Sequence, residues 1–89
     1  MQREPRRWRT SFGRWVRAYG AARIASGMQR TGHPVTHWAV YHWMAGSHSP
    51  RAEHIAALVR LSRGTISVGD VYRHQEVVRR SLIRQPKER

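Results

Sequence analysis

The sequence predicts an all-α fold, a compact bundle of about five helices. Apolar residues recur at every third or fourth position in several segments, which is the spacing of one face of a helix. Sustained alternation of apolar and polar residues, which is typical of β-strands, is not found. Clusters rich in Gly, Pro and Ser separate the helical segments, so each helix has recognisable ends.

The first helix is expected to end at Tyr19. The second helix is expected to span residues 21–29. The apolar face of the first helix consists of Phe12, Trp15, Val16 and Tyr19. Thr10 or Ser11 can cap its start, because either hydroxyl can accept a hydrogen bond from a free backbone N–H. The apolar face of the second helix consists of Ala21, Ile24, Ala25 and Met28. The breaker cluster RTGHP then separates it from the third helix.

The third helix is expected to run from residue 34 or 35 to Ala45, where Gly46 can end it. In the fourth helix, Ser49 is expected to cap the first turn. Pro50 is expected at the first helical position, where its missing N–H is not needed. The inner stripe of the fourth helix consists of Ile55, Leu58, Val59 and Ser62.

A fifth helix is expected over residues 68–84, because Ser67 and Asp70 have the S-x-x-D spacing of a capping box. Its apolar stripe is longer than a core of four short helices requires. We therefore predict that this stripe makes a homodimer contact. The expected dimer-contact residues are Val71, Tyr72, Val78, Leu82 and Ile83. Packing of the same stripe on the first helix is the alternative.

The chain is expected to hold a single helical domain. Residues 1–9 are expected to form a flexible basic arm, residues 10–84 the helical domain and residues 85–89 a polar tail. The absence of cysteine excludes disulfides and thiolate metal sites. No apolar run approaches the roughly 20 residues of a membrane span, and no signal peptide is recognised. We expect a cytoplasmic, nucleoid-associated protein without a membrane partner.

The charge of the chain indicates a polyanionic partner. The net charge is +12, and all 17 basic residues except Lys87 are Arg, against 5 acidic residues. A guanidinium group suits phosphates and guanine edges because it is planar and bidentate. A GC-rich genome also favours Arg over Lys, but it does not explain the scarcity of acids. Nucleic acid is therefore the expected partner, ahead of an anionic membrane surface.

Residues 36–43, THWAVYHW, carry bulky groups on two sides of the third helix. At roughly 100° per residue, one side gathers Thr36, Ala39, Val40, Trp43 and Met44. The other side gathers Trp38, Tyr41, His42 and Ala45, with His37 at the flank. The first side is expected in the core. The second side is expected to meet solvent, and an aromatic outer face in so basic a protein favours a recognition helix that enters the DNA major groove.

Four short motifs follow one another between residues 21 and 74. They are Ile24-Ala25 with Met28, Val35-Thr36 with Val40 and Trp43, Met44-Ala45-Gly46 with Pro50, and Ile66 to Val71. Their order and spacing resemble those of the Cro/repressor-type helix-turn-helix domains of phage and bacterial regulators. The turn QRTGHPVT is several residues longer than is usual in that family.

The resemblance implies a Cro/lambda-repressor-like fold and a sequence-specific regulator of transcription that binds double-stranded DNA, acting as a repressor that occludes its operator as a dimer. The expected base-reading residues are Thr36, His37, Trp38, Tyr41 and His42. The expected phosphate-contacting residues are Ser47, His48, Arg51, Arg30, Arg7 and Arg9. Helix starts attract phosphates through their free N–H groups, and a basic arm can follow the DNA backbone.

Several alternatives remain open at this point. Thr36 can simply cap the third helix, and Trp38 can pack on the preceding turn, bridge a dimer or press on a sugar–phosphate backbone. A non-transcriptional DNA-binding module is one alternative function, either a terminase small subunit or an antitoxin with a protein partner. An RNA-binding or ribosome-associated protein is another, since arginine-rich helices and stacking aromatics also suit RNA.

Enzymatic activity, a metal and a cofactor are not expected. His33 and His37 have the i, i+4 spacing of a helical metal pair, but Pro34 lies between them and no carboxylate is near. The acidic residues are scattered along the chain. No glycine-rich phosphate loop and no nucleophile–base spacing is present.

Overall fold

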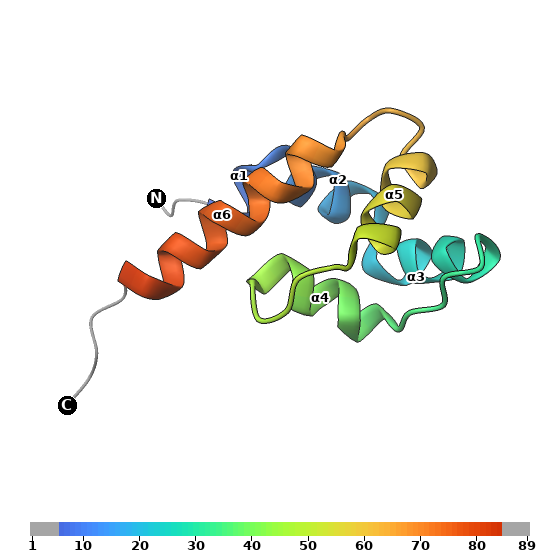
Figure 1. Cartoon of the computed structure of the whole chain (residues 1–89), viewed down its shortest axis with the longest axis horizontal. Helices are drawn as coiled ribbons and strands as arrows, with labels where there is room; N and C mark the ends of the chain where they lie inside the picture. The colour runs from blue at the N-terminus through green and yellow to red at the C-terminus, as the bar shows by residue number, and fades with distance from the viewer. Residues whose placement is uncertain (1–5, 85–89) are drawn as a thin grey trace.

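The computed structural model describes the backbone of residues 6–84 and the side chains of residues 8–80. These residues form helices and no strand, so the predicted all-α fold is confirmed (Figure 1). The helices are α1 (Arg6–Arg9), α2 (Ser11–Tyr19), α3 (Ala21–Arg30), α4 (His37–Ala45), α5 (Ala52–Leu61) and α6 (Val68–Arg84). The five segments predicted to be helical correspond to α2 through α6.

Two groups of helices share one core. In the first group, α3 packs on α4 and α5, and in the second, the long α6 packs on α1 and α2. Contacts of α6 with α4 and α5 join the groups. The side chains that are completely buried come from every helix except α1, and they include Phe12, Ile24, Met28, Val40, Leu58 and Val71.

Residues 6–9 are helical, where the sequence predicted a flexible arm. The half-buried Trp8 explains this difference, because its ring packs against the core and the guanidinium of Arg17 lies 4.5 Å from the ring centroid. A tertiary contact of this kind fixes a turn of chain whose local sequence is only basic and polar. Residues 1–5 and the predicted polar tail, 85–89, lie outside the described residues.

Most of the predicted helix ends are confirmed. The Thr10 hydroxyl caps α2 by accepting from the Gly13 N–H at 2.9 Å. Gly46 ends α4 in the left-handed conformation, with φ of 86°. Ser67 and Asp70 form the predicted capping box, each side chain accepting from the backbone N–H of the other at 3.1 and 2.9 Å.

Two helix starts differ from the prediction. Helix α4 begins at His37, because the Thr36 hydroxyl caps it by accepting from the Ala39 N–H at 3.2 Å. Helix α5 begins at Ala52 with Arg51 as its N-cap residue, and not at Pro50 with Ser49 as its cap. The Ser49 hydroxyl instead donates to Gln75 on α6, so a tertiary hydrogen bond replaces the local one.

The apolar stripe of α6 lies inside the protomer, which corrects part of the predicted dimer contact. Val71 and Val78 are 0% and 4% exposed, because α6 packs across α2. They are therefore not available to a second copy of the chain, and the alternative packing on the first long helix is confirmed. Tyr72 remains 57% exposed. The side chains of Leu82 and Ile83 lie outside the described residues.

Candidate nucleic-acid interface

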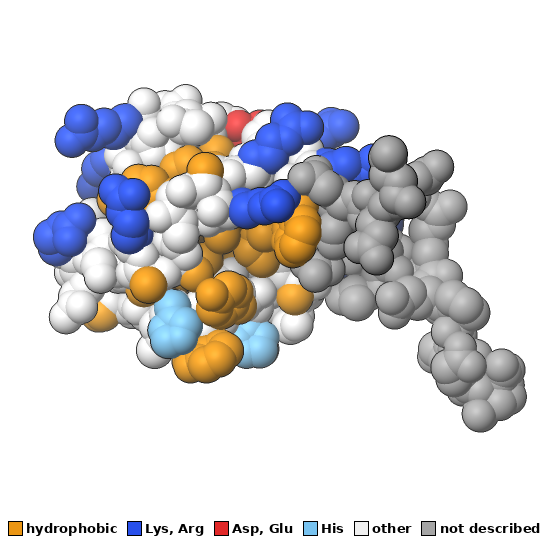
Figure 2. Space-filling model, turned by 180° about the vertical axis from the view of Figure 1, so that it is seen from behind, with side chains coloured by type: hydrophobic (Ala, Val, Ile, Leu, Met, Phe, Trp, Pro, Cys, Tyr) orange, Lys and Arg blue, Asp and Glu red, His pale blue; other side chains and the backbone are white. Residues whose placement is uncertain are grey.

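The outward side of α4 presents four exposed rings, those of His37, Trp38, Tyr41 and His42, which we call the α4 outer face. Trp38 and Tyr41 are 62% and 52% exposed. The ring of Trp38 lies 4.7 Å from that of His37 and 5.8 Å from that of Tyr41, measured between centroids. Figure 2 shows apolar and imidazole side chains gathered at the lower edge of the molecule. Exposed rings that lie together in this way form a candidate contact surface.

The loop after α4 joins this surface. The ring of His48 lies 4.8 Å from that of His42, edge to face. The carbonyl of His42 accepts from the backbone N–H groups of Gly46, Ser47 and His48 at 3.0, 3.1 and 3.4 Å. Ser47 and His48 are exposed, and these hydrogen bonds hold them at the C-terminal end of the α4 outer face.

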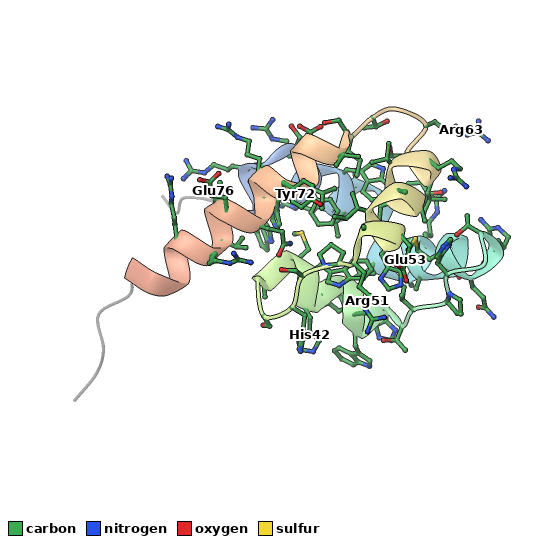
Figure 3. The ribbon with its side chains drawn as sticks, in the orientation of Figure 1. His42, Arg51, Glu53, Arg63, Tyr72 and Glu76 are labelled. Atoms are coloured by element: carbon green, nitrogen blue, oxygen red, sulfur yellow. The ribbon has the colours of Figure 1, made fainter. Side chains whose placement is uncertain are left out.

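The first turn of α5 follows this loop. Arg51 is its exposed N-cap residue, and its side chain makes no capping hydrogen bond to the helix. The first N–H groups of any helix lack intrahelical partners and favour anions. Figure 3 places Arg51 and His42 on the α4 side of the molecule, whereas Arg63 lies at the far end of α5. A phosphate beside the α4 outer face would therefore meet both a helix start and a guanidinium.

The inward side of α4 fixes the helix on the core. Val40, Trp43 and Met44 are 0%, 4% and 7% exposed. The Trp43 ring also lies 5.6 Å from the His54 ring of α5. The division of the two sides agrees with the prediction from helical periodicity, which placed these three residues inside and Trp38, Tyr41 and His42 outside; His37, predicted at the flank, is exposed.

Helix α6 supplies the hydrogen bonds that the last turn of α4 requires. The final carbonyls of a helix have no intrahelical donor. Here the Gln75 side-chain amide donates to the Trp43 carbonyl at 3.1 Å, and the His74 Nε2 atom donates to the Met44 carbonyl at 3.0 Å. Since both donors belong to a long packed helix, the direction of α4 is set by α6 as well as by the apolar core.

His74 is buried and joins three helices. Its Nε2 atom must carry the proton, because the Met44 carbonyl can only accept. Its Nδ1 atom therefore accepts from the Thr10 hydroxyl at 2.5 Å, the same hydroxyl that caps α2. Burial lowers the pKa of His74 below 6.5, although its hydrogen bond to the Met44 carbonyl acts in the opposite direction. The neutral imidazole is thus the form that links α2, α4 and α6.

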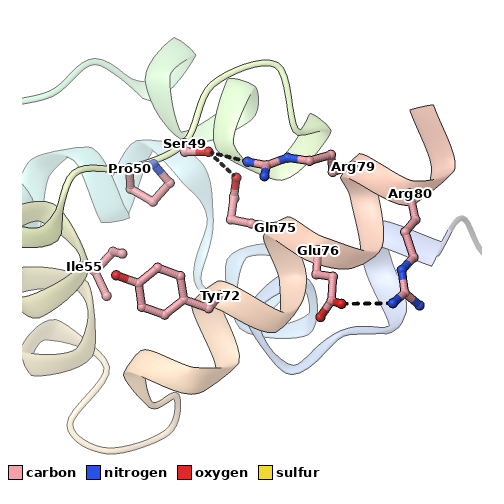
Figure 4. Close-up of a pocket in the computed structure, with 8 residues that line it drawn as sticks. All are labelled: Ser49, Pro50, Ile55, Tyr72, Gln75, Glu76, Arg79 and Arg80. Carbon is pink, nitrogen blue, oxygen red and sulfur yellow. Dashed lines mark hydrogen bonds and ion pairs between the residues drawn. The ribbon is translucent and has the colours of Figure 1, made fainter. Parts of the chain in front are cut away.

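A second set of hydrogen bonds holds the loop between α4 and α5 (Figure 4). The Ser49 hydroxyl donates to Gln75 Oε1 at 2.9 Å, and Arg79 donates to the same hydroxyl at 3.4 Å. Beside them lies a cavity of about 320 Å³ between this loop and α6, with Tyr72 and Ile55 in its lining. The loop that presents Ser47 and His48 is therefore attached to α6.

The structure brings most of the predicted contact residues together. Five predicted base-reading residues lie in or just before α4, and Ser47, His48 and Arg51 follow it directly. Arg30 is exposed at the end of α3, across the turn 31–36. Arg9 lies on α1, which packs mainly on α2 and α6. The side chain of Arg7 lies outside the described residues.

Sequence reasoning missed the two residues of α6 that position α4. His74 and Gln75 are 0% and 7% exposed, and they follow Val71 by three and four positions. That spacing puts them on the buried stripe of the helix, which is the signal that could have identified them. A polar residue on such a stripe requires a buried hydrogen-bond partner.

Two further features of the described residues concern metal ligands and membrane-spanning helices. No group of three or more His, Asp or Glu side chains in residues 8–80 can hold a metal ion. His33 lies outside α4, and its ring lies 6.2 Å from that of His54 on α5. None of the described helices combines the length and the apolar character of a transmembrane segment.

Comparison with known protein families, with characterised proteins and with solved structures finds no match.

Proposed function

We propose that this protein is a sequence-specific regulator of transcription that binds double-stranded DNA by inserting α4 into the major groove. The observation that carries the proposal is the α4 outer face, an exposed cluster of rings on a helix whose other side is fixed by the core and by α6. The major groove admits one α-helix, and its floor exposes base edges and thymine methyl groups that such side chains can contact.

The helix preceding α4 supports the same proposal. Helix α3 packs on α4, and six residues, 31–36, connect them. This arrangement suits a helix-turn-helix with α3 as its first helix, as the resemblance to Cro/repressor-type domains implies. The connection is longer than that family's usual turn, yet the two helices remain packed against each other.

The roles of the side chains follow from their chemistry. Trp38, Tyr41 and His42 would contact base edges, whereas Ser47 and Arg51 would contact phosphates, which position the protein without reading sequence. The net charge of +12 would make the affinity strongly salt-dependent. Repression would follow from occlusion of the operator. A homodimer would require a near-palindromic site with half-sites about one DNA turn apart.

The direct test is selection of bound fragments from a random duplex library at near-physiological salt, where binding to phosphates alone is weakened. We expect recovered fragments to share a motif. Recovery of fragments without a shared motif would contradict sequence-specific binding.

Two variants then distinguish a residue that reads the base sequence from a residue that contacts phosphates. We expect Arg51→Ala to weaken binding of all duplexes by a similar factor, and His42→Ala to change which duplexes are preferred. Arg60→Ala, an exposed arginine of α5 that lies outside the proposed interface, serves as the matched control. If His42→Ala and Arg51→Ala act equally on all sequences, α4 is not the reading helix.

Single-stranded RNA is the second candidate ligand. The exposed rings of His37, Trp38 and Tyr41, which lie next to one another on α4, favour it, because unpaired bases stack on exposed aromatic side chains. A competition assay between duplex DNA and single-stranded RNA of equal length decides between the two. Preferential displacement by RNA would assign the α4 outer face to RNA.

A further inference from the structure

A cavity of about 620 Å³ opens between α2 and α4, beside the α4 outer face. Buried side chains of Val16, Ala21 and Met44 contribute to its lining, and the more exposed rings of Trp8 and Tyr41 belong to its rim. Figure 2 shows apolar side chains gathered in a hollow on this face, with basic side chains above it and the cluster of rings below it.

The chemistry of the lining indicates a flat anion. Arg17 is the charged side chain among the described residues of the lining, and its guanidinium lies 4.5 Å from the centroid of the Trp8 ring. The other lining residues in the described part of the chain, residues 8–80, are aromatic, aliphatic or glycine, and none of these is acidic. Aromatic and aliphatic walls favour a planar apolar body, and a guanidinium favours a carboxylate.

Small residues keep this space open. A Cβ atom built on Gly20 would meet no atom within 4 Å, and Ala45 contributes only a methyl group from the last turn of α4. The volume lies within the roughly 300–1,000 Å³ range of small-molecule sites. The cavity is therefore large enough for a ligand of one or two rings.

We propose that this cavity binds a small aromatic carboxylate, with the ring system against Val16 and Met44 and the carboxylate on Arg17. The proposal does not depend on the identity of the nucleic acid. Because Tyr41 belongs both to the cavity and to the α4 outer face, a bound ligand would alter the surface that we propose for DNA. The site would thus allow a metabolite to regulate binding at the α4 outer face.

The probe is indole-3-acetate, titrated into the isotope-labelled full chain without nucleic acid and followed by amide chemical shifts. We expect saturable shifts centred on Gly20, Ala21, Met44 and Ala45. The uncharged analogue indole-3-acetamide should bind roughly tenfold more weakly, because it cannot form the charge-assisted hydrogen bond.

Substitutions in the cavity test the two parts of the proposal, which are the contact of the carboxylate with Arg17 and the space for the ring system. Arg17→Gln should weaken indole-3-acetate binding roughly tenfold, and Arg17→Lys should retain most of it because the charge remains. Arg60→Gln is the control for charge. Ala45→Met should block the cavity, whereas Ala56→Met, at an exposed alanine of α5, should leave binding unchanged.

Three results would overturn the proposal. They are absence of saturation at millimolar probe, shifts centred on Trp38 or on α6 and not on the cavity, and equal affinity of the Arg17→Gln variant. Each of these results concerns the protein alone, so none of them bears on whether α4 binds DNA. Conversely, loss of DNA binding in His42→Ala says nothing against the cavity.

Discussion

The two sides of α4 both carry a tryptophan, and their surroundings are opposite. Trp43 is 4% exposed and packs among the core helices, whereas Trp38, five residues earlier, is 62% exposed. Burial in the core explains the first tryptophan. It does not explain the second, because exposed apolar area forgoes about 25 cal/mol for every Å² that could be removed from water. The exposure of the outer tryptophan supports our proposal that a partner buries it.

The polar contacts of the two sides differ as well. On the inner side, α6 binds the carbonyls of Trp43 and Met44 through Gln75 and His74. On the outer side, the rings of His37, Trp38 and Tyr41 contact one another. The inner side of α4 therefore sets the position of the helix, and the outer side remains accessible for binding. Substitutions on the two sides should accordingly affect different properties.

The largest expected difference concerns the two tryptophans. We expect Trp43→Ala to lower the free energy of unfolding by about 3–5 kcal/mol, since it removes a large buried side chain from the core. Trp38→Ala should change it by less than about 0.5 kcal/mol, because the ring is mostly exposed. Urea unfolding followed by circular dichroism measures both. Equal decreases in the free energy of unfolding of the two variants would contradict the difference between the two sides of α4.

The next effect concerns His74 and pH. Because its folded-state pKa is lowered, the unfolded state binds more protons as the pH falls below 6.5. The stabilising contribution of neutral His74 is thus fully present above pH 6.5 and is lost as the pH falls toward the lowered pKa. We expect His74→Gln to flatten the dependence of unfolding free energy on pH between about 5 and 7.5, the range in which histidine titrates.

The control for this prediction is His48→Gln, which replaces an exposed histidine and should retain the dependence on pH. Unfolding curves at several pH values provide the measurement. An unchanged slope in His74→Gln would show that the buried imidazole is not the titrating group.

The smallest of the three effects is expected at Gln75. Gln75→Ala removes the donor to the Trp43 carbonyl and the acceptor for the Ser49 hydroxyl, which should lower the free energy of unfolding by about 1–3 kcal/mol. It should also speed amide hydrogen exchange in the loop 46–49. Glu76→Ala, which breaks only the exposed pair with Arg80, should change stability by less than about 1 kcal/mol. Unchanged exchange in Gln75→Ala would mean that α6 does not hold the loop.

Local pattern predicted most of the fold. The helical segments, the Ser67–Asp70 capping box and the Gly46 end of α4 depend on residues close together in sequence, and the structure contains all of them. The differences arise where a distant residue intervenes. Trp8 orders α1 by contacting the core, and Gln75 takes the Ser49 hydroxyl that was expected to cap α5.

The sequence likewise predicted only part of the candidate site. Helical periodicity placed Trp38, Tyr41 and His42 outside and His37 at the flank, and all four side chains are exposed. It also identified the stripe with Val71 and Val78 but not what covers that stripe, and the predicted dimer contact there was wrong. A sequence shows that a surface is apolar without showing its partner. For the same reason, no pattern in the sequence predicted the cavity between α2 and α4, because it exists only where the two helices meet.

The most direct test of the central claim is a map of the DNA contact on the protein. Amide chemical shifts of the labelled chain would be recorded as a selected duplex is added. We predict the largest changes in residues 36–48 and in the first turn of α5, with little change in residues 71–78 of α6, which pack behind α4. Changes centred on α6 or on the chain termini, with residues 37–42 unaffected, would contradict the account.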